Sequence, residues 1–233
     1  MQVLILAGGF GTRMSEETDY IPKPMVRIGN LPILEHIINY YARFEHRKFI
    51  IALGYKAEVI FDYFDRNARK DLDISLVDTG IETSTGGRIK KLEPYLDENF
   101  MMTYGDGLSN VNLHQLLEHH KRLGKLATVT AVRPPARFGK IEFQNSVVTR
   151  FSEKDSQDVG WINGGFFCLK KEICRFIKDA DTSFESEPMN QLVKLRELVA
   201  FEHNGWWQPM DTLRDKRLLE EMLKNGNAPW LAP

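Results

Sequence analysis

A glycine-rich turn directly after an apolar segment near the amino terminus most constrains what this chain can fold into. Residues 4–7 are apolar, and Gly8, Gly9 and Gly11 follow them. A short apolar run before such a turn predicts a buried strand. Glycines in the turn let backbone N–H groups close around phosphate oxygens, because no Cβ blocks their approach. The segment therefore predicts a phosphate-binding turn at the end of a strand.

Two cations lie close to this turn in the sequence. Arg13 follows it almost directly, and Lys23 lies ten residues further on, between two prolines. Fixed positive charge is what a protein supplies where a pyrophosphate develops negative charge as it leaves. The combination predicts nucleotidyl transfer from a nucleoside triphosphate, with an NDP-linked product.

The glycine spacing argues against two commoner phosphate-binding motifs. A dinucleotide fingerprint requires G-x-G-x-x-G, and Met14 occupies the position of its last glycine. A P-loop requires Lys followed by Ser or Thr after the last glycine, whereas Thr12 and Arg13 stand there. A turn that only joins a strand to a helix is the remaining alternative, and the presence of both Arg13 and Lys23 favours the phosphate site.

Composition indicates one globular domain with no net charge that would attract nucleic acid or an anionic membrane. The chain has 233 residues, of which 42% are hydrophobic, and this is enough to fill a substantial core. We expect a single nucleotidyltransferase domain over residues 1–233, with a nucleotide-binding half (1–135) and an acceptor-binding half (136–233). The 31 basic and 32 acidic residues leave a net charge of −1, so we expect no nucleic-acid partner and no membrane surface.

The amino-terminal apolar run and the cysteines indicate the compartment. The run is about five residues long, too short for a signal-peptide core or a membrane span. Cys168 and Cys174 fit no metal-binding or C-x-x-C spacing. We therefore expect a cytoplasmic protein with two free thiols.

Apolar runs alternate with helical patterns along the first half, which predicts an α/β fold. We expect a Rossmann-like, mixed but mostly parallel sheet flanked by helices. The expected strands are Gln2–Leu6, Phe49–Leu53, Ile74–Val77, Phe100–Tyr104 and Ala127–Val132, and the expected helices are Ile33–Tyr41, Lys56–Phe64 and Leu113–Leu123. Ligands bind beyond the carboxyl ends of the strands in such sheets, so the glycine turn and Asp106 should converge.

The second half changes character, with short alternating segments separated by turn residues. This pattern predicts a small antiparallel β extension attached to the parallel sheet. Its expected strands are Lys140–Phe143, Val147–Phe151 and Ile162–Leu169. Helices are expected at Lys171–Ile177, Pro188–Glu197 and Leu213–Leu223, with a strand at Val199–Glu202.

Two aspartates are candidate magnesium ligands. Asp106 lies between two glycines at an expected strand end, and Asp211 lies where the last helix should start. Mg²⁺ usually takes one or two carboxylates together with substrate phosphates and water, so two aspartates are a sufficient protein contribution. The alternatives are an ordinary turn residue for Asp106 and a helix N-cap for Asp211.

Two further polar positions could hold an acceptor molecule. Lys154 ends an expected strand and could bind a second phosphate, although a lysine there is usually only solvated. Asn163 lies among apolar residues beside Gly164 and Gly165 and could hydrogen-bond a polar acceptor. An ordinary core strand with a bulge at the glycines is the alternative for this segment.

Motifs spread over nearly the whole chain resemble those of the glucose-1-phosphate cytidylyltransferase family, within the sugar nucleotidyltransferase superfamily. The first glycine motif is shared across the superfamily, whereas Ser15–Thr18 and Gln208–Lys216 resemble the cytidylyltransferase branch specifically. The other matching segments are Pro22–Val26, Pro32–Leu34, Val77–Gly80, Thr85–Arg88, Thr103–Gly107, Arg137–Gly139 and Asn163–Phe167.

The resemblance implies a nucleotidyltransferase fold and an Mg²⁺-dependent reaction of CTP with a phosphorylated small-molecule acceptor. The default acceptor is glucose 1-phosphate or a related sugar 1-phosphate, and the products are a CDP-linked compound, of the kind used for surface polysaccharides, and pyrophosphate. Arg13, Lys23 and Asp106 would be catalytic, and Asp106 and Asp211 would hold the metal. The implied nucleotide-binding residues are Leu6, Ala7, Gly8, Gly9, Gly11, Thr12, Arg13, Lys23, Thr85, Gly86, Gly87 and Asp106. The implied acceptor-binding residues are Lys154, Asn163, Gly164 and Glu187.

The chain departs from the family pattern in one segment and two positions. Residues 64–73 are a short connection where the family carries a long insertion that contributes to the subunit interface and the nucleotide site. Asp155 follows Lys154 where proline is usual, and Phe184 replaces a tryptophan. Because these changes gather on the acceptor side, a non-sugar phosphate such as a phosphorylated amino acid or a choline-like compound is an alternative acceptor. A non-catalytic nucleotide-binding module is a further alternative, and a homo-oligomer is compatible with the resemblance.

Overall fold

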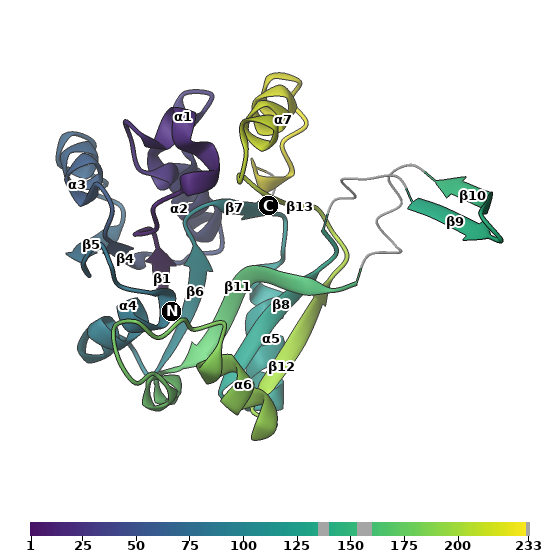
Figure 1. The fold of residues 1–233 in the computed structure, drawn as a ribbon. Helices are drawn as coiled ribbons and strands as arrows, with labels where there is room; N and C mark the ends of the chain where they lie inside the picture. The colour runs from purple at the N-terminus through teal and green to yellow at the C-terminus, as the bar shows by residue number, and fades with distance from the viewer. Residues whose placement is uncertain (135–139, 153–159, 232–233) are drawn as a thin grey trace.

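The computed structural model describes residues 1–134, 140–152 and 160–231, and a mixed β-sheet forms its centre (Figure 1). The strand order is β12-β8-β11-β6-β1-β4-β5. Strands β6, β1, β4 and β5 are parallel neighbours, and β12 is parallel to β8, whereas β11 is antiparallel to β6 and β8. The bounds are β1 Gln2–Leu6, β4 Lys48–Leu53, β5 Asp73–Asp78, β6 Asn99–Tyr104, β8 Ala127–Val132, β11 Ile162–Lys170 and β12 Leu198–His203. The predicted α/β class with a mixed, mostly parallel sheet is confirmed.

Side chains of β1 alternate between two hydrophobic cores, one on each face of the sheet. Val3 and Ile5 belong to the core that contains α2 (Ile33–Arg43), and Leu4 and Leu6 belong to the core that contains α4 (Thr85–Leu92). Successive residues of a strand point to opposite faces. The strand reads as a continuous apolar run because helices cover both faces.

The other helices connect the strands and close the two cores. They are α1 Ser15–Thr18, α3 Ala57–Arg66, α5 Leu113–Leu123, α6 Glu187–Lys194 and α7 Leu213–Lys224. Helix α5 has the bounds that the sequence predicts, because Asn112 caps its first turn and Gly124 ends it in a left-handed conformation. No helix in the described part of the chain combines the length and the apolarity needed to cross a membrane.

Three small antiparallel sheets complete the described fold, and one of them positions the site. They pair β2 (Arg27–Ile28) with β3 (Leu31–Pro32), β9 (Lys140–Gln144) with β10 (Val147–Ser152), and β7 (Gly107–Ser109) with β13 (Trp207–Pro209). In the last pair Gly107 lies opposite Pro209, and the Met210 N–H donates to the Asp106 carbonyl oxygen at 2.9 Å. This pairing brings the carboxyl-terminal part of the chain to the end of β6.

The structure differs from the sequence expectations at several elements. The hairpin β9–β10 forms as predicted and β11 is antiparallel to its neighbours, but β11 lies inside the main sheet, between β6 and β8. The expected helix at residues 171–177 is the 3₁₀ segment η5 (Lys171–Phe176). Helix α4 escapes prediction because it begins with Thr-Gly-Gly, which has low helix propensity.

Candidate active site

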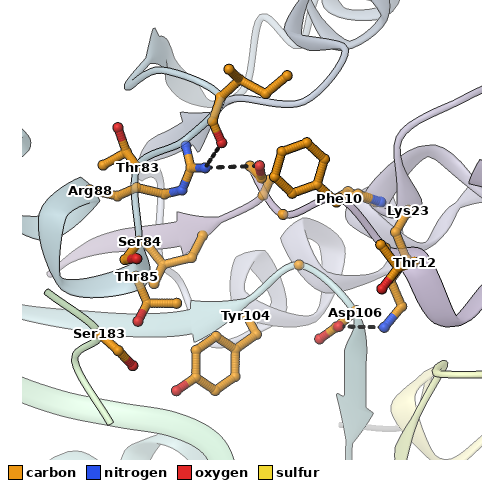
Figure 2. Close-up of a pocket in the computed structure, with 18 of the residues that line it drawn as sticks. Phe10, Thr12, Lys23, Thr83, Ser84, Thr85, Arg88, Tyr104, Asp106 and Ser183 are labelled. Atoms are coloured by element: carbon orange, nitrogen blue, oxygen red, sulfur yellow. Dashed lines mark hydrogen bonds and ion pairs between the residues drawn. The ribbon is translucent and has the colours of Figure 1, made fainter. Parts of the chain in front are cut away.

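A cavity of about 720 Å³ opens at the carboxyl ends of β1 and β6 (Figure 2). This is the edge at which open α/β sheets bind ligands, and the volume is in the usual range for a small-molecule site. Of the residues implicated from the sequence, those that line it are Leu6, Ala7, Gly8, Gly9, Gly11, Thr12, Lys23, Thr85, Asp106, Asn163 and Asp211. The glycine turn and Asp106 therefore meet at one cavity.

Lys23 joins the two candidate metal ligands. Its Nζ lies 2.7 Å from Asp106 Oδ2 and 2.7 Å from Asp211 Oδ1. Lys23 begins the 3₁₀ segment η2 (Lys23–Met25) and is buried, with 8% of its surface exposed. Burial alone would lower the pKa of Lys23, but the charge and hydrogen bonds of Asp106, and then of Asp211, outweigh it and raise the pKa. The ammonium therefore stays charged beside both carboxylates.

The two carboxylates suit a hard divalent cation. Both contact the same ammonium nitrogen, so both carboxylates face the same point in the cavity. Mg²⁺ prefers oxygen ligands and completes its shell with phosphate oxygens and water. Among the described residues, no group of three or more His, Cys, Asp or Glu side chains could hold a metal. The donor set of Asp106 and Asp211 thus fits an ion that substrate oxygens help to bind.

Asp211 is available to this cluster because another residue caps the last helix. Thr212 is the N-cap of α7, and its side chain accepts from the Asp215 N–H at 3.2 Å. Asp215 completes a capping box, since its Oδ2 accepts from the Thr212 N–H at 2.9 Å. The alternative that Asp211 is the N-cap is therefore wrong by one residue.

Arg88 supports the glycine turn, a role that the sequence did not indicate. Its guanidinium donates to the carbonyl oxygens of Gly8 (2.9 Å), Leu53 (2.6 Å) and Gly80 (3.0 Å), and so ties together the ends of β1, β4 and β5. A Cβ at Gly8 or Gly54 would lie 2.2 Å or 2.5 Å from Arg88 Nη1. A side chain at either position would therefore displace the Arg88 guanidinium from these bonds.

Other residues of the predicted nucleotide set have different surroundings. Thr85 lines the cavity, but Gly86 and Gly87 do not. A Cβ at Gly86 would lie 2.6 Å from the Thr182 carbonyl oxygen, and one at Gly87 would lie 2.2 Å from that of Ala180. These glycines allow α4 to pack against the segment before α6. Arg13 belongs to the 3₁₀ segment η1 (Thr12–Met14), and its side chain is not among those that the structure describes.

The predicted acceptor residues are only partly brought together. Asn163 lines the cavity, whereas the carbonyl oxygen of the adjacent Gly164 accepts from Trp207 Nε1 at 2.7 Å. Glu187 begins α6 and accepts from Gln191 Nε2 at 2.8 Å, away from the cavity lining. Glu185, two residues earlier, lines the cavity instead. Lys154 lies outside the described residues.

Fold and cavity together define an α/β enzyme of the nucleotidyltransferase type. The family model described as "Nucleotidyl transferase" matches residues 2–215. Glucose-1-phosphate cytidylyltransferase of Salmonella typhi is 44% identical, with 99% of this chain and 98% of that protein covered. The probable glucose-1-phosphate cytidylyltransferase of Bacillus subtilis is 39% identical, with 99% of each covered. The chain belongs to the nucleotidyl transferase family, in its group of glucose-1-phosphate cytidylyltransferases.

Solved structures agree with this assignment. HddC from Yersinia pseudotuberculosis, crystallised with GMP-PN, superposes with a TM-score of 0.75 at 25% identity, covering 95% of this chain and 99% of that one. A putative glucose-1-phosphate thymidylyltransferase from Bacillus anthracis shares the fold, with a TM-score of 0.76 at 17% identity, over 95% of this chain and 96% of that one. The nucleotidyltransferase fold predicted from the sequence is confirmed.

Proposed function

We propose that this protein condenses CTP with glucose 1-phosphate to give CDP-glucose and pyrophosphate, in an Mg²⁺-dependent reaction. The observation that carries the proposal is that the cluster of Lys23, Asp106 and Asp211 lines the same cavity as the glycine turn. The choice of substrates is supported by the two relatives named above, a glucose-1-phosphate cytidylyltransferase and a probable one. This chain matches each of them over nearly its whole length.

The reaction needs no nucleophile from the protein. An oxygen of the acceptor phosphate, already ionised at neutral pH, attacks the α-phosphorus of CTP. The new phosphorus–oxygen bond forms as the bond from the α-phosphorus to the bridging oxygen breaks, and pyrophosphate leaves with that electron pair. The protein therefore contributes alignment of the two phosphates and stabilisation of the charge on the leaving group.

The residues of the charged part of the cavity divide this work. Backbone N–H groups of Gly8, Gly9 and Gly11 would hold the triphosphate, because no side chain blocks their approach. The Lys23 ammonium would neutralise charge at the reacting phosphates. Asp106 and Asp211 would hold Mg²⁺, which when bound supplies further neutralisation of phosphate charge.

The remaining expectations become part of the same proposal. We propose that residues 1–233 act as one domain, because strands from both halves of the chain belong to the seven-stranded sheet. We place the reaction in the cytoplasm, the compartment that supplies CTP. A homo-oligomer is compatible with this activity, and sedimentation velocity of the purified protein measures its size.

Pyrophosphate release measured with a panel of substrates tests the proposal. CTP, UTP, GTP and dTTP are each combined with glucose 1-phosphate, other hexose 1-phosphates, phosphocholine and phosphoserine, with and without Mg²⁺. We expect the highest kcat/KM for CTP with glucose 1-phosphate and no turnover in EDTA. Turnover only with phosphocholine or phosphoserine would replace the sugar acceptor, and binding of CTP without turnover of any pair would indicate a non-catalytic module.

A further inference from the structure

One wall of the cavity carries a carboxylate surrounded by hydroxyl groups. Glu185 Oε1 accepts from the Tyr104 hydroxyl at 2.5 Å. Glu185 Oε2 accepts from Thr85 Oγ1 at 2.5 Å and from Ser183 Oγ at 2.7 Å. We call Glu185 with Thr85, Tyr104 and Ser183 the hydroxyl wall. All four residues line the cavity, so a ligand in it can reach them.

The hydroxyl wall is brought together from three parts of the chain. Thr85 begins α4, Tyr104 ends β6, and Ser183 and Glu185 lie in the segment before α6. Thr85 Oγ1 also accepts from the Phe184 N–H at 3.0 Å, which holds this segment against α4. In Figure 2 the Tyr104 side chain points away from Asp106, towards Thr85 and Ser183. The wall therefore lies apart from the cluster of Lys23, Asp106 and Asp211.

The wall offers hydrogen-bond acceptors to a ligand, and the amide of Asn163 beside it, which also lines the cavity, offers a donor. The hydroxyls of Thr85, Tyr104 and Ser183 each donate their proton to the Glu185 carboxylate. An ionised carboxylate has about four lone-pair sites, and three are used here. Each hydroxyl keeps acceptor capacity, and Asn163 Nδ2 lies 3.4 Å from the Tyr104 oxygen. Groups that donate and accept together, as alcohols do, complement such a surface.

Two other ligand groups suit the wall poorly. A phosphate would meet the Glu185 carboxylate, and the lysine and arginine among the described lining residues, Lys23 and Arg88, bond to other groups. A quaternary ammonium is usually held between aromatic faces. Tyr104 is the one aromatic side chain of the wall, and it packs edge-on against Phe167.

We propose that the hydroxyl wall binds neighbouring hydroxyl groups of a sugar ring and that Glu185 determines this specificity. The proposal rests on the function proposed above and replaces Glu187 with Glu185 as the carboxylate that faces the sugar. Neighbouring ring hydroxyls occur both on the acceptor sugar and on the ribose of CTP. The chemistry of recognition is the same for both, and kinetics with each substrate separates them.

Glu185→Gln tests the assignment with little change in shape. We expect a 10- to 100-fold lower kcat/KM, carried by the KM of one substrate, with kcat within about threefold of the wild type. A rise in the KM of glucose 1-phosphate identifies the acceptor sugar, and a rise in that of CTP identifies the ribose. Glu187→Gln is the matched control and should change neither KM by more than twofold, because Glu187 bonds Gln191 outside the cavity.

Deoxy substrates provide a readout that a merely structural role would not move. The wild type should discriminate against 2-deoxyglucose 1-phosphate or against 2′-deoxy-CTP by 10-fold or more, and Glu185→Gln should lose that discrimination. If Glu185→Gln fails to fold, as judged by thermal unfolding, Tyr104→Phe removes one hydroxyl of the wall and serves the same comparison.

Three results would overturn the inference. They are unchanged KM values in Glu185→Gln, an equal change of KM in Glu187→Gln, or a Glu185→Gln variant that still discriminates against both deoxy compounds as the wild type does. Each presupposes a wild type that turns over CTP. Absence of wild-type turnover would instead contradict the proposed function. In that case calorimetric titration of glucose 1-phosphate and of CMP into the wild type and Glu185→Gln still tests the wall, and equal affinities for both ligands would exclude it.

Discussion

The two ends of the cavity differ in how they are built. The charged end holds Lys23 between Asp106 and Asp211, at 2.7 Å from each. The hydroxyl wall holds Glu185 among three hydroxyl groups and no described cation. Paired groups of opposite charge suit the transfer of charged phosphates. A carboxylate whose hydrogen bonds come from hydroxyl groups suits recognition of an uncharged sugar ring. The difference suggests that the first end controls rate and the second controls specificity.

The largest expected effect is at the charged end. Asp106→Asn should lower kcat by about 10³-fold or more, because it removes charge from the Lys23 cluster and from the proposed metal site. Steady-state release of pyrophosphate measures this. Asp97→Asn is the matched control, since Asp97 also pairs with a lysine, Lys48, but at the exposed surface. A kcat near that of the wild type in Asp106→Asn, with only KM raised, would contradict the division of labour.

Lys23→Met separates the ammonium from the carboxylates. We expect kcat to fall about 10²-fold and the affinity for Mg²⁺ without nucleotide to rise, because Asp106 and Asp211 lose their shared cation.

Because its pKa is raised above the ordinary value of 10.5, Lys23 should stay charged and cause no loss of wild-type activity between pH 7 and 10.

Isothermal titration calorimetry of Mg²⁺ into the wild type and into Lys23→Met, without nucleotide, measures the affinity of each for the metal. Lys48→Met, at the exposed pair with Asp97, is the control. An unchanged or weaker affinity in Lys23→Met would show that the two aspartates do not form the metal site.

Arg88→Met should have an intermediate effect. The buried guanidinium positions the Gly8 carbonyl oxygen and the loops after β4 and β5, so its loss leaves several carbonyls without their donor. We expect a loss of about 3 kcal/mol in the free energy of unfolding and a 10- to 100-fold lower kcat/KM for CTP. Chemical denaturation and steady-state kinetics measure the two effects.

Gly54→Ala provides an independent test of the same contact. Its Cβ would lie 2.5 Å from Arg88 Nη1 and 2.8 Å from the Gly8 carbonyl oxygen, so the contact between the guanidinium and Gly8 must shift although the charge remains. A similar fall in kcat/KM for CTP would assign the effect to the position of the guanidinium. Arg66→Met, at an exposed helix position, should leave both stability and kcat/KM unchanged.

The smallest effect concerns the cap that leaves Asp211 available. Thr212→Ala should cost about 1 kcal/mol of stability and lower kcat three- to tenfold, because the adjacent Asp211 loses its orientation. Asn112→Ala removes a comparable cap from α5, outside the cavity lining, and should cost similar stability without changing kcat. Equal kcat values for the two variants would remove the link between the cap and the charged end.

Elements with a long, regular pattern were predicted well, and very short ones were not. Strand β1 and helix α5 have the predicted bounds, because an apolar run that ends at glycines and a helical periodicity that ends at Gly124 are both local signals. Strands β7 and β13 have three residues each, too few for a periodic signal. They form because each pairs with a segment about 100 residues away, which places Asp211 beside Asp106.

The sequence by itself determined the strand, the glycine turn and the cation at Lys23, because residues within one short segment specify all three. It also indicated Asp106, since a carboxylate after a strand lies at the ligand-binding edge of the sheet. The cap of α7 at Thr212 is also a local signal, because Thr212 and Asp215 have the spacing of a capping box. Only the tertiary structure decided that Glu185 and not Glu187 faces the cavity. The direction of a side chain near a helix start depends on how the backbone is held by distant partners, and a difference of one or two residues reverses it.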